Sequence, residues 1–194
     1  MRQSATTRPG NRRDKPPPKP LTAVRLEELG LAYVARFAVS AAKLDAYLRR
    51  KLRERGWAGE GEPAVDAVVE RFVASGYVDD AAYARSKTGS LLRRGYGMRR
   101  VSQTLGAAGI GEEARLAAPA AEDDRRRAAL VMARKRRLGP FGAGPADRAA
   151  REKQIAALLR AGHPLDSARQ LVDAPSIEAA EEWAAQAIGN DACD

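Results

Sequence analysis

Three segments of this sequence that end in glycine recur at a fixed interval. Each has leucine at its first position and glycine at its fifth, and both intervals between successive glycines are 53 residues; the segments are 52–56, 105–109 and 158–162. Glycine commonly ends helices because it adopts the left-handed conformation at no steric cost. A fixed period of this length indicates tandem structural units. Stacked units make an elongated or curved body with a long concave face, which suits contact with another extended object.

The fold class predicted from the pattern is all-α, with three helices in each unit. Apolar residues recur at three- and four-residue spacing, as in Met98, Val101, Leu105 and Ala108, and no run with period-two alternation predicts a strand. Polar residues at helix starts are candidate N-caps, namely Ser40, Asp79 or Asp80, Asp147 and Ser176. The predicted helices span about 21–37, 40–56, 63–76, 79–95, 98–108, a short segment after 112, 121–138, 147–162, 165–174 and 176–188. The first of them carries Leu26, Leu29, Tyr33 and Phe37 on one side.

The chain divides into five predicted parts. Residues 1–20 combine five prolines with basic residues and have little to bury, which predicts a disordered basic arm. Three-helix units are expected at 21–78, 79–119 and 120–174, and an acidic helix and tail at 175–194. The last helix of the middle unit has only Leu116 as a large apolar residue. In the acidic helix Trp183 and Ile188 require burial, so we expect this helix to cover the final unit.

The net charge of +9 is concentrated in the middle of the chain. Residues 85–137 contain 14 lysines and arginines against 5 acidic residues, whereas residues 173–194 contain 6 acidic residues and no basic one. Part of this pattern is ordinary helix stabilisation, because the predicted helix at 121–138 is acidic at its start and basic at its end. The remaining positive field favours nucleic acid or an acidic protein surface as the partner.

Cysteine and histidine are too few for a disulfide or for a metal site built from them. The chain has one cysteine, Cys193, and one histidine, His163. His163 directly follows the glycine of the third repeat, where the other two units have Trp57 and Ile110. We therefore interpret His163 as a ring packed over a helix end. The residues suggest no partner for it.

No motif of a known catalytic or cofactor site occurs in the sequence. Glycine-rich phosphate and dinucleotide loops are absent, as is the H-E-x-x-H zinc motif. Asp79 and Asp80 could be a carboxylate pair for a metal, but their position at a helix start favours capping. No signal peptide or apolar membrane-spanning run is found. We expect a soluble, cytoplasmic protein without cofactor or enzymatic activity.

The candidate functional residues lie around one turn in the middle of the chain. Arg93, Arg94, Arg99 and Arg100 bracket the sequence Gly95-Tyr96-Gly97, so four guanidinium groups are concentrated there. We take these four as the leading contact residues, with Arg85 and Tyr96 second. For each arginine the alternative is a solvated helix face. For Tyr96, packing against the preceding helix is the stronger interpretation.

The same region resembles the RecX family of bacterial regulatory proteins. The residues that carry the resemblance are Gly76-Tyr-Val-Asp-Asp80, Tyr83-Ala84-Arg85, Arg94-Gly-Tyr-Gly97, Arg99-Arg100-Val101, Leu105 and Gly109-Ile110, with weaker similarity at 40–56 and 155–162. The resemblance implies a cytoplasmic, non-enzymatic, monomeric protein of DNA repair and recombination, built from tandem three-helix repeats. It also implies binding to RecA, in the groove of its filament on single-stranded DNA. Family members typically suppress filament extension, strand exchange, ATP hydrolysis and co-protease activity.

A DNA-binding helix-turn-helix protein that acts without RecA is the alternative. In that case the helix at 98–108 would enter the major groove of DNA. Its core positions are taken by apolar residues, which leaves Arg99, Arg100, Ser102, Gln103 and Thr104 on the outside. Sequence-specific binding by the isolated protein would favour this alternative.

Overall fold

The fold is all-α, as the sequence predicts, in a computed structural model that describes residues 19–116, 120–144 and 147–186. The helices are α1 (Ala23–Val34), α2 (Ala41–Arg55), α3 (Val65–Ala74), α4 (Asp80–Arg93), α5 (Met98–Gly106), α6 (Glu112–Leu116), α7 (Glu122–Arg136), α8 (Arg148–Ala161), α9 (Leu165–Val172) and α10 (Ile177–Ala185), with a 3-10 turn, η1 (Gly139–Phe141). Within these ranges no strand forms, and the one extended pairing is an isolated bridge between Leu21 and Trp57. Residues 1–18 of the arm predicted at 1–20, and also Ile188 and Cys193, lie outside the described residues.

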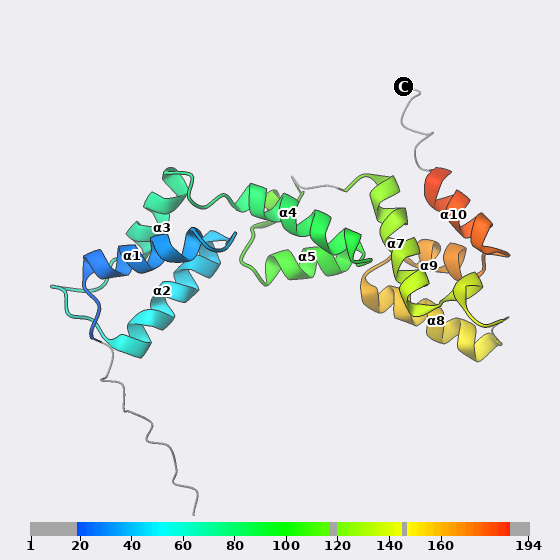
Figure 1. Cartoon of the computed structure of the whole chain (residues 1–194), viewed down its shortest axis with the longest axis horizontal. Coiled ribbons are helices and arrows are strands. Elements are labelled where there is room, and N and C mark those ends of the chain that lie inside the picture. Colours follow the sequence, from blue (N-terminus) through cyan, green and yellow to red (C-terminus); the bar gives the residue numbers. More distant parts are fainter. Residues whose placement is uncertain (1–18, 117–119, 145–146, 187–194) are drawn as a thin grey trace, which may run out of the picture.

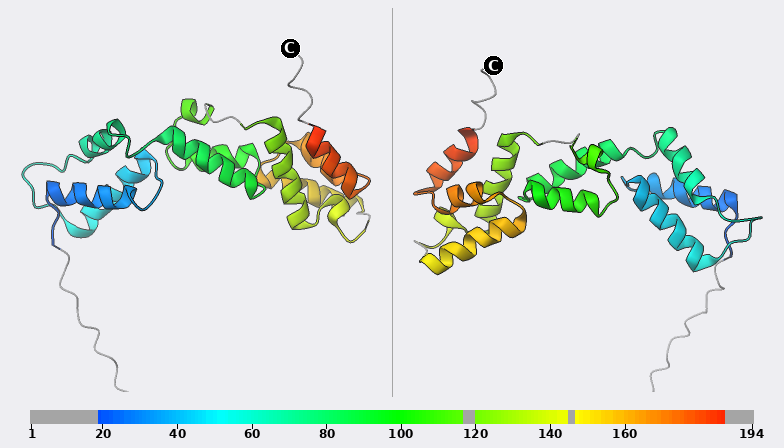
Figure 2. Two further views of the ribbon diagram at one scale, coloured as in Figure 1. Left: turned by 45° about the horizontal axis from the view of Figure 1, so that its top comes forward. Right: turned by 180° about the vertical axis from the view of Figure 1, so that it is seen from behind.

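Three groups of helices follow one another along the long axis of the molecule (Figure 1). We call α1–α3 unit 1, α4–α6 unit 2 and α7–α9 unit 3. Each unit has its own apolar core, centred on Leu44 and Leu48 in unit 1, on Val101 and Leu105 in unit 2, and on Leu158 and Leu171 in unit 3. The two further views show the same row of units in an elongated, shallowly curved body (Figure 2).

Four helices begin at the N-caps that the sequence indicates. The side chains of Ser40, Asp79, Asp147 and Ser176 accept hydrogen bonds from the backbone N–H three residues later. The sequence left Asp79 and Asp80 as alternative caps of α4, and Asp79 is the cap. Asp80 makes a different contact. Its Oδ1 accepts from the backbone N–H of Ala41, 2.9 Å away at the start of α2, and so joins unit 2 to unit 1.

The first helix is shorter than predicted, and one of its expected core residues is exposed. α1 ends at Val34, and Phe37 has 53% of its surface exposed, so Phe37 does not belong to the buried side. Tyr33 instead stacks on Tyr47 of α2, with ring centroids 4.0 Å apart. The chain leaves the helix after this contact. Phe37 therefore stands beyond the last helical turn.

The repeated glycines end the second helix of each unit, and two of them also join units. The C-terminal end of α5 meets the N-terminal end of α2, where Ser40 Oγ donates to the Ala108 carbonyl over 2.5 Å. A Cβ on Gly109 would lie 2.2 Å from the Cβ of Ala42. In the same way the C-terminal end of α8 meets the N-terminal end of α5. The second helices of the three units therefore follow one another end to end.

The first repeat ends differently from the other two. Gly56 has open space around its Cβ position, and the chain after it turns away in an extended conformation. Leu21 donates to the Gly56 carbonyl and accepts from Ala58, both over 2.9 Å. The segment before α1 thus covers the end of α2, at the place where another unit would dock.

The acidic helix α10 packs against unit 3. Ala180 and Ala184 are buried, and Trp183 packs against the core of that unit. Arg126 of α7 donates to the Trp183 carbonyl over 3.2 Å, and its guanidinium lies 5.2 Å from the centre of the Trp183 ring. These contacts agree with the prediction that α10 covers the final unit. No helix among the described residues has the length and apolar character needed to cross a membrane.

Candidate functional site

The structure brings five of the six predicted site residues to one place, the joint between units 2 and 3. Arg93 and Arg94 end α4, Tyr96 lies in the turn, and Arg99 and Arg100 are in the first turn of α5. Arg85 lies eight residues before Arg93 on α4, roughly 12 Å along the helix axis, and is not part of this cluster. All five arginines are exposed, and none forms an ion pair within the described part of the chain.

The turn between α4 and α5 is shaped by Gly95, as the sequence indicates. Gly95 has a positive φ of 90°, and the N–H groups of Gly95 and Tyr96 donate to Leu92 and Leu91 over 2.8 and 3.0 Å. This pair of bonds is the glycine C-cap in which the helix carbonyls are satisfied. A second constraint is tertiary, since a Cβ on Gly95 would lie 2.9 Å from the backbone nitrogen of Met132 on α7.

The start of α5 is covered by the end of α8. The N–H of Gly97 donates to the Ala161 carbonyl over 3.0 Å, and the N–H of Arg99 donates to the Gly162 carbonyl over 3.2 Å. The positive end of one helix dipole therefore faces the negative end of the other. Arg99 adds a side-chain bond from Nη2 to the Leu159 carbonyl over 2.8 Å. Arg99 is thus engaged in the joint, whereas the side chains of Arg93, Arg94 and Arg100 form no hydrogen bond within the described residues.

Tyr96 packs in the joint, in agreement with the more conservative interpretation of this residue. Its ring is half-buried and contacts the cores of both unit 2 and unit 3. The guanidinium of Arg94 lies 5.5 Å from the ring centre, a distance at which a cation and an aromatic face attract each other.

Unit 3 adds lysine to the cluster, which sequence reasoning missed. Lys135 Nζ donates to the Arg94 carbonyl over 3.1 Å, so the last turn of α7 lies beside the last turn of α4. The charges at 134–137 are explained equally well by the dipole of α7, and no sequence spacing relates Lys135 to a residue 41 positions away. We call Arg93, Arg94, Arg99, Arg100 and Lys135 the basic joint.

His163 is buried in the same joint, with 5% of its surface exposed. Its N–H caps α8 by donating to the Leu158 carbonyl over 3.1 Å, which matches the prediction of a ring packed over a helix end. The ring also has a partner that the sequence did not suggest, since Nε2 lies 3.0 Å from the Gly95 carbonyl. Burial lowers the pKa of His163, and the bond to Gly95 opposes part of that shift. The carbonyl only accepts, so the neutral ring donates from Nε2.

Five of the eleven other basic residues in unit 3 form ion pairs among the described residues. On α7, Arg125, Arg126 and Arg127 pair with the acidic residues of the first turn. Arg134 pairs with Glu181 of α10. The basic joint has no such partners among the described residues, so its field is available to an acidic surface or a phosphate backbone.

The geometry of the joint argues against the alternative of a DNA-binding helix-turn-helix protein that acts without RecA. Recognition helices of that class contact bases with their N-terminal residues. The N-terminal turn of α5 is covered by α8, and Arg99 is bound to the Leu159 carbonyl. The part of α5 that would enter a groove is therefore occupied by unit 3.

The middle of the chain matches the domain described as "RecX, second three-helix domain", over residues 79–118. The regulatory protein RecX of Myxococcus xanthus is 32% identical over 176 residues, 85% of this chain and 94% of that protein. The regulatory protein RecX of Xanthomonas campestris is 37% identical over 124 residues, 63% of this chain and 72% of that protein.

Two crystal structures share the fold. RecX from Lactobacillus salivarius superposes with a TM-score of 0.62 and 15% identity, covering 77% of this chain and 94% of that one. A second structure, of a regulatory protein RecX, has a TM-score of 0.59 and 19% identity, covering 78% of this chain and 73% of that one.

Proposed function

The chain belongs to the RecX family of regulatory proteins, and we propose from this that it modulates RecA by binding the RecA filament on single-stranded DNA. Its effect is to inhibit filament extension and with it the recombinase, ATPase and co-protease activities. The partners are RecA and single-stranded DNA, and the protein acts as a cytoplasmic monomer without catalysis or cofactor of its own. We assign the contacts with these partners to the three-helix units at 21–78, 79–119 and 120–174.

The observation that supports this proposal most is the basic joint in the middle of an elongated body. Arg93, Arg94 and Arg100 are exposed and have no ion-pair partner among the described residues. Arg100 also stands in the first turn of α5, where positive charge opposes the dipole of that helix. A charge placed against the stability of its own helix suggests a role in binding. A body of stacked units can extend along a filament groove, with the joint facing acidic groups.

The decisive experiment adds the protein to preformed RecA filaments on single-stranded DNA and follows ATP hydrolysis. We expect the unchanged protein to lower the hydrolysis rate. The triple variant R93E/R94E/R100E should need at least about tenfold more protein for the same inhibition. Arg99 is kept, because its bond to the Leu159 carbonyl holds units 2 and 3 together and its loss would confuse structure with binding.

The matched control reverses three exposed arginines outside the joint, in R36E/R53E/R148E. This variant has the same net charge as the first, so a difference between the two reports position rather than total charge. If the unchanged protein has no effect on filaments, the proposed function is wrong. If both variants inhibit equally, the basic joint is not the contact.

Salt dependence separates direct DNA contact from contact with RecA. On single-stranded DNA the slope of log affinity against log salt falls by about 0.7 for each phosphate contact removed. We expect R93E/R94E/R100E to lose about 2 from this slope and the control to lose none. An unchanged slope would assign the three arginines to acidic groups of RecA.

A further inference from the structure

Two polar side-chain atoms of unit 2 are buried without a hydrogen-bond partner. They are Thr88 Oγ1 on α4 and Arg115 Nε on α6, and no other buried side-chain nitrogen or oxygen is left unpaired among the described residues. Thr88 has only 5% of its surface exposed. Buried polar groups in folded proteins are nearly always hydrogen-bonded, so each exception needs an explanation. Both exceptions line the same hollow.

The hydroxyl of Thr88 is unpaired although a threonine inside a helix usually finds a partner in the helix itself. Thr104 of α5 shows the usual arrangement, since its Oγ1 donates to the Arg100 carbonyl one turn earlier over 2.8 Å. Among the described residues Thr88 makes no such bond. Its hydroxyl is therefore available to a molecule that enters the hollow.

The hollow lies between α4, α5 and α6 and has a volume of about 240 Å³. Its wall on α5 is apolar and consists mainly of Met98, Val101 and Leu105. One water molecule takes about 30 Å³ in the liquid, so the hollow has room for a larger group. Apolar walls with a few polar groups are the usual form of a small-ligand site. The fitting occupant has an apolar body and a hydrogen-bonding edge.

The polar groups of the hollow define which hydrogen bonds this occupant makes. Thr88 and Arg115 can both donate, through the hydroxyl and through Nε–H. Glu112, on the exposed side of α6, only accepts, and it forms no ion pair with Arg115 among the described residues. One positive and one negative group balance each other, so the fitting occupant is uncharged. It presents an acceptor to Thr88 and Arg115 and a donor to Glu112.

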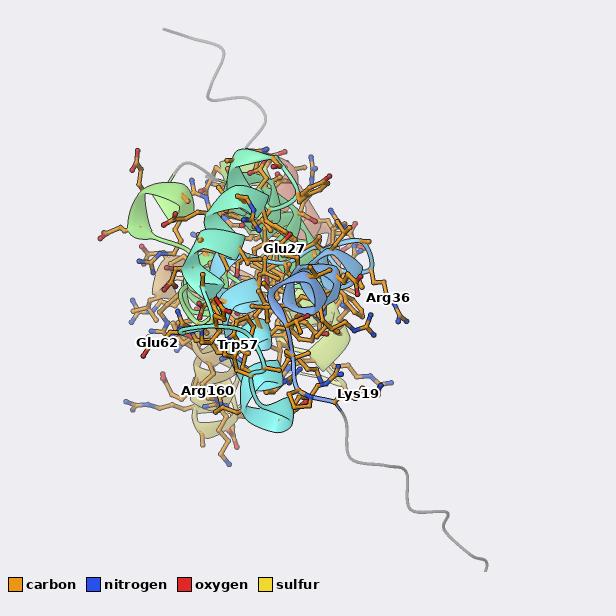
Figure 3. The ribbon with its side chains drawn as sticks, turned by 90° about the vertical axis from the view of Figure 1, so that its left-hand side faces the viewer. Lys19, Glu27, Arg36, Trp57, Glu62 and Arg160 are labelled. Atoms are coloured by element: carbon orange, nitrogen blue, oxygen red, sulfur yellow. The ribbon has the colours of Figure 1, made fainter. Side chains whose placement is uncertain are left out.

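The short helix α6 is the wall that can admit such a group. It has five residues, and Gly111 before it has open space around its Cβ position. Figure 3 looks along the row from the end that carries Trp57 and Glu62, and it shows α6, in pale green, at one side of the molecule. Since the two unpaired atoms are buried, an occupant reaches them when Arg115 turns outward on this helix.

The basic joint lies next to the hollow. Arg93 Nη1 is 3.1 Å from the position that a Cβ on Gly89 would take, and Gly89 directly follows Thr88 on α4. On α5, Met98 of the apolar wall directly precedes two arginines of the joint. Arginines attract phosphates, and the uncharged ring that a phosphate backbone carries is a nucleobase. Bases of a single strand can turn out of the stack and enter pockets of this kind.

We propose that the hollow of unit 2 receives one unstacked nucleobase of single-stranded DNA, held by Thr88 and Arg115 at its inner edge and by Glu112 at its outer edge. This proposal rests on the proposed function, which includes single-stranded DNA as a partner. The acceptors and the amino group that the hollow requires occur together on the pairing edge of cytosine. A base contact neutralises no phosphate, so it raises the affinity without changing its salt dependence.

The test compares two fluorescently labelled oligonucleotides of equal length, one of deoxycytidines and one without bases, for binding to the isolated protein at low salt. Both strands carry the same phosphates. We expect the unchanged protein to bind the deoxycytidine strand at least about fivefold more tightly. The variant T88V/R115K removes the hydroxyl and the Nε–H but keeps the charge. It should bind both strands alike, with the salt slope of the unchanged protein.

The matched control is T104V, because the Thr104 hydroxyl is already bonded within α5 and does not line the hollow. It should keep the preference for the deoxycytidine strand. Valine has the shape of threonine, and urea unfolding checks that each variant folds.

Equal binding of the two strands by the unchanged protein would overturn the proposal, and so would an undiminished preference in T88V/R115K. The proposed function is judged separately, by ATP hydrolysis of RecA filaments. If the protein lowers that hydrolysis but binds both strands alike, the base site is wrong and the proposed function stands. If the protein has no effect on filaments, the proposed function is wrong whichever strand it prefers.

Discussion

Gly97 and Gly162 face each other across the joint between units 2 and 3. A Cβ on Gly97 would lie 2.3 Å from the carbonyl oxygen of Gly162, and a Cβ on Gly162 would lie 2.5 Å from the backbone nitrogen of Arg100. Backbone atoms cannot move aside as a flexible side chain can. Gly97 has an ordinary φ of −82°, so glycine is required there by contact and not by backbone conformation.

We expect Gly97→Ala to destabilise the protein by about 1–3 kcal/mol, because the added methyl group overpacks the joint. Gly106→Ala is the matched control in the same helix. Its nearest neighbour within 3.4 Å is the end of the Arg115 side chain, and alanine favours the helix by about 0.5–1 kcal/mol. Urea unfolding of both variants should therefore move in opposite directions. Equal effects would mean that the close approach at Gly97 does not limit stability.

His163 makes the same joint sensitive to acid. Burial lowers the pKa of His163 in the folded protein. As the pH falls through the ordinary value of 6.5, His163 is therefore protonated in the unfolded chain before it is protonated in the folded protein. The unfolded state thus binds more protons as the pH falls below about 6.5, and the free energy of unfolding decreases there. Above that pH His163 is neutral in both states, so its contribution to the free energy of unfolding no longer changes with pH.

We expect the unchanged protein to lose more stability than His163→Gln between about pH 7 and about pH 5.5, measured by urea unfolding. Glutamine can still donate to the Gly95 carbonyl but does not titrate. Carboxylates titrate equally in both proteins, so the comparison isolates the histidine. Parallel pH curves for the two proteins would show that the ring is protonated in the folded state without cost.

At the scale of helices, one pattern of contact serves both joints. The C-terminal end of α5 meets the start of α2, and the C-terminal end of α8 meets the start of α5. Each contact places the negative end of one helix dipole against the positive end of another. The residue that completes the contact differs. Ser40 donates its hydroxyl to the Ala108 carbonyl in one joint, and Arg99 donates to the Leu159 carbonyl in the other.

Ser40→Ala should cost more stability than Ser176→Ala. Both serines cap a helix, which is worth about 1 kcal/mol. Ser40 is also fully buried and satisfies the Ala108 carbonyl, and leaving that carbonyl unpaired costs about 1–3 kcal/mol more. Urea unfolding of the two variants measures the difference. Similar losses would indicate that the Ala108 carbonyl finds another partner and that the joint between units 1 and 2 is independent of Ser40.

At the scale of the whole molecule, charge and apolar surface are segregated along the row of units. Unit 1 is nearly neutral and exposes apolar side chains, the joint of units 2 and 3 is basic, and α10 adds acidic residues at the far end. Each unit contacts its neighbour in the row, as in repeat proteins, and α4 of unit 2 packs against α7 of unit 3. The ends of the row are covered by Leu21 at Gly56 and by α10 on unit 3.

The sequence by itself determined the fold class, the helix starts and the repeat. These features depend on local chemistry: periodic apolar residues, side-chain caps such as Ser40 and Asp147, and glycines that end helices. It also located the arginines of the central turn and, through its resemblance, the family. Phe37 shows the limit of this reasoning, since apolar spacing placed it on a buried face while the helix ends before it.

Only the tertiary structure decided how the units meet. Asp80 bonds to α2, Lys135 to the end of α4, and His163 to the Gly95 carbonyl, over separations of 39, 41 and 68 residues. No local pattern specifies such contacts, because they depend on where two helix ends arrive after packing. The same holds for Arg99, which looks like its three neighbours in the sequence. Its engagement with the Leu159 carbonyl follows from the meeting of two helix ends.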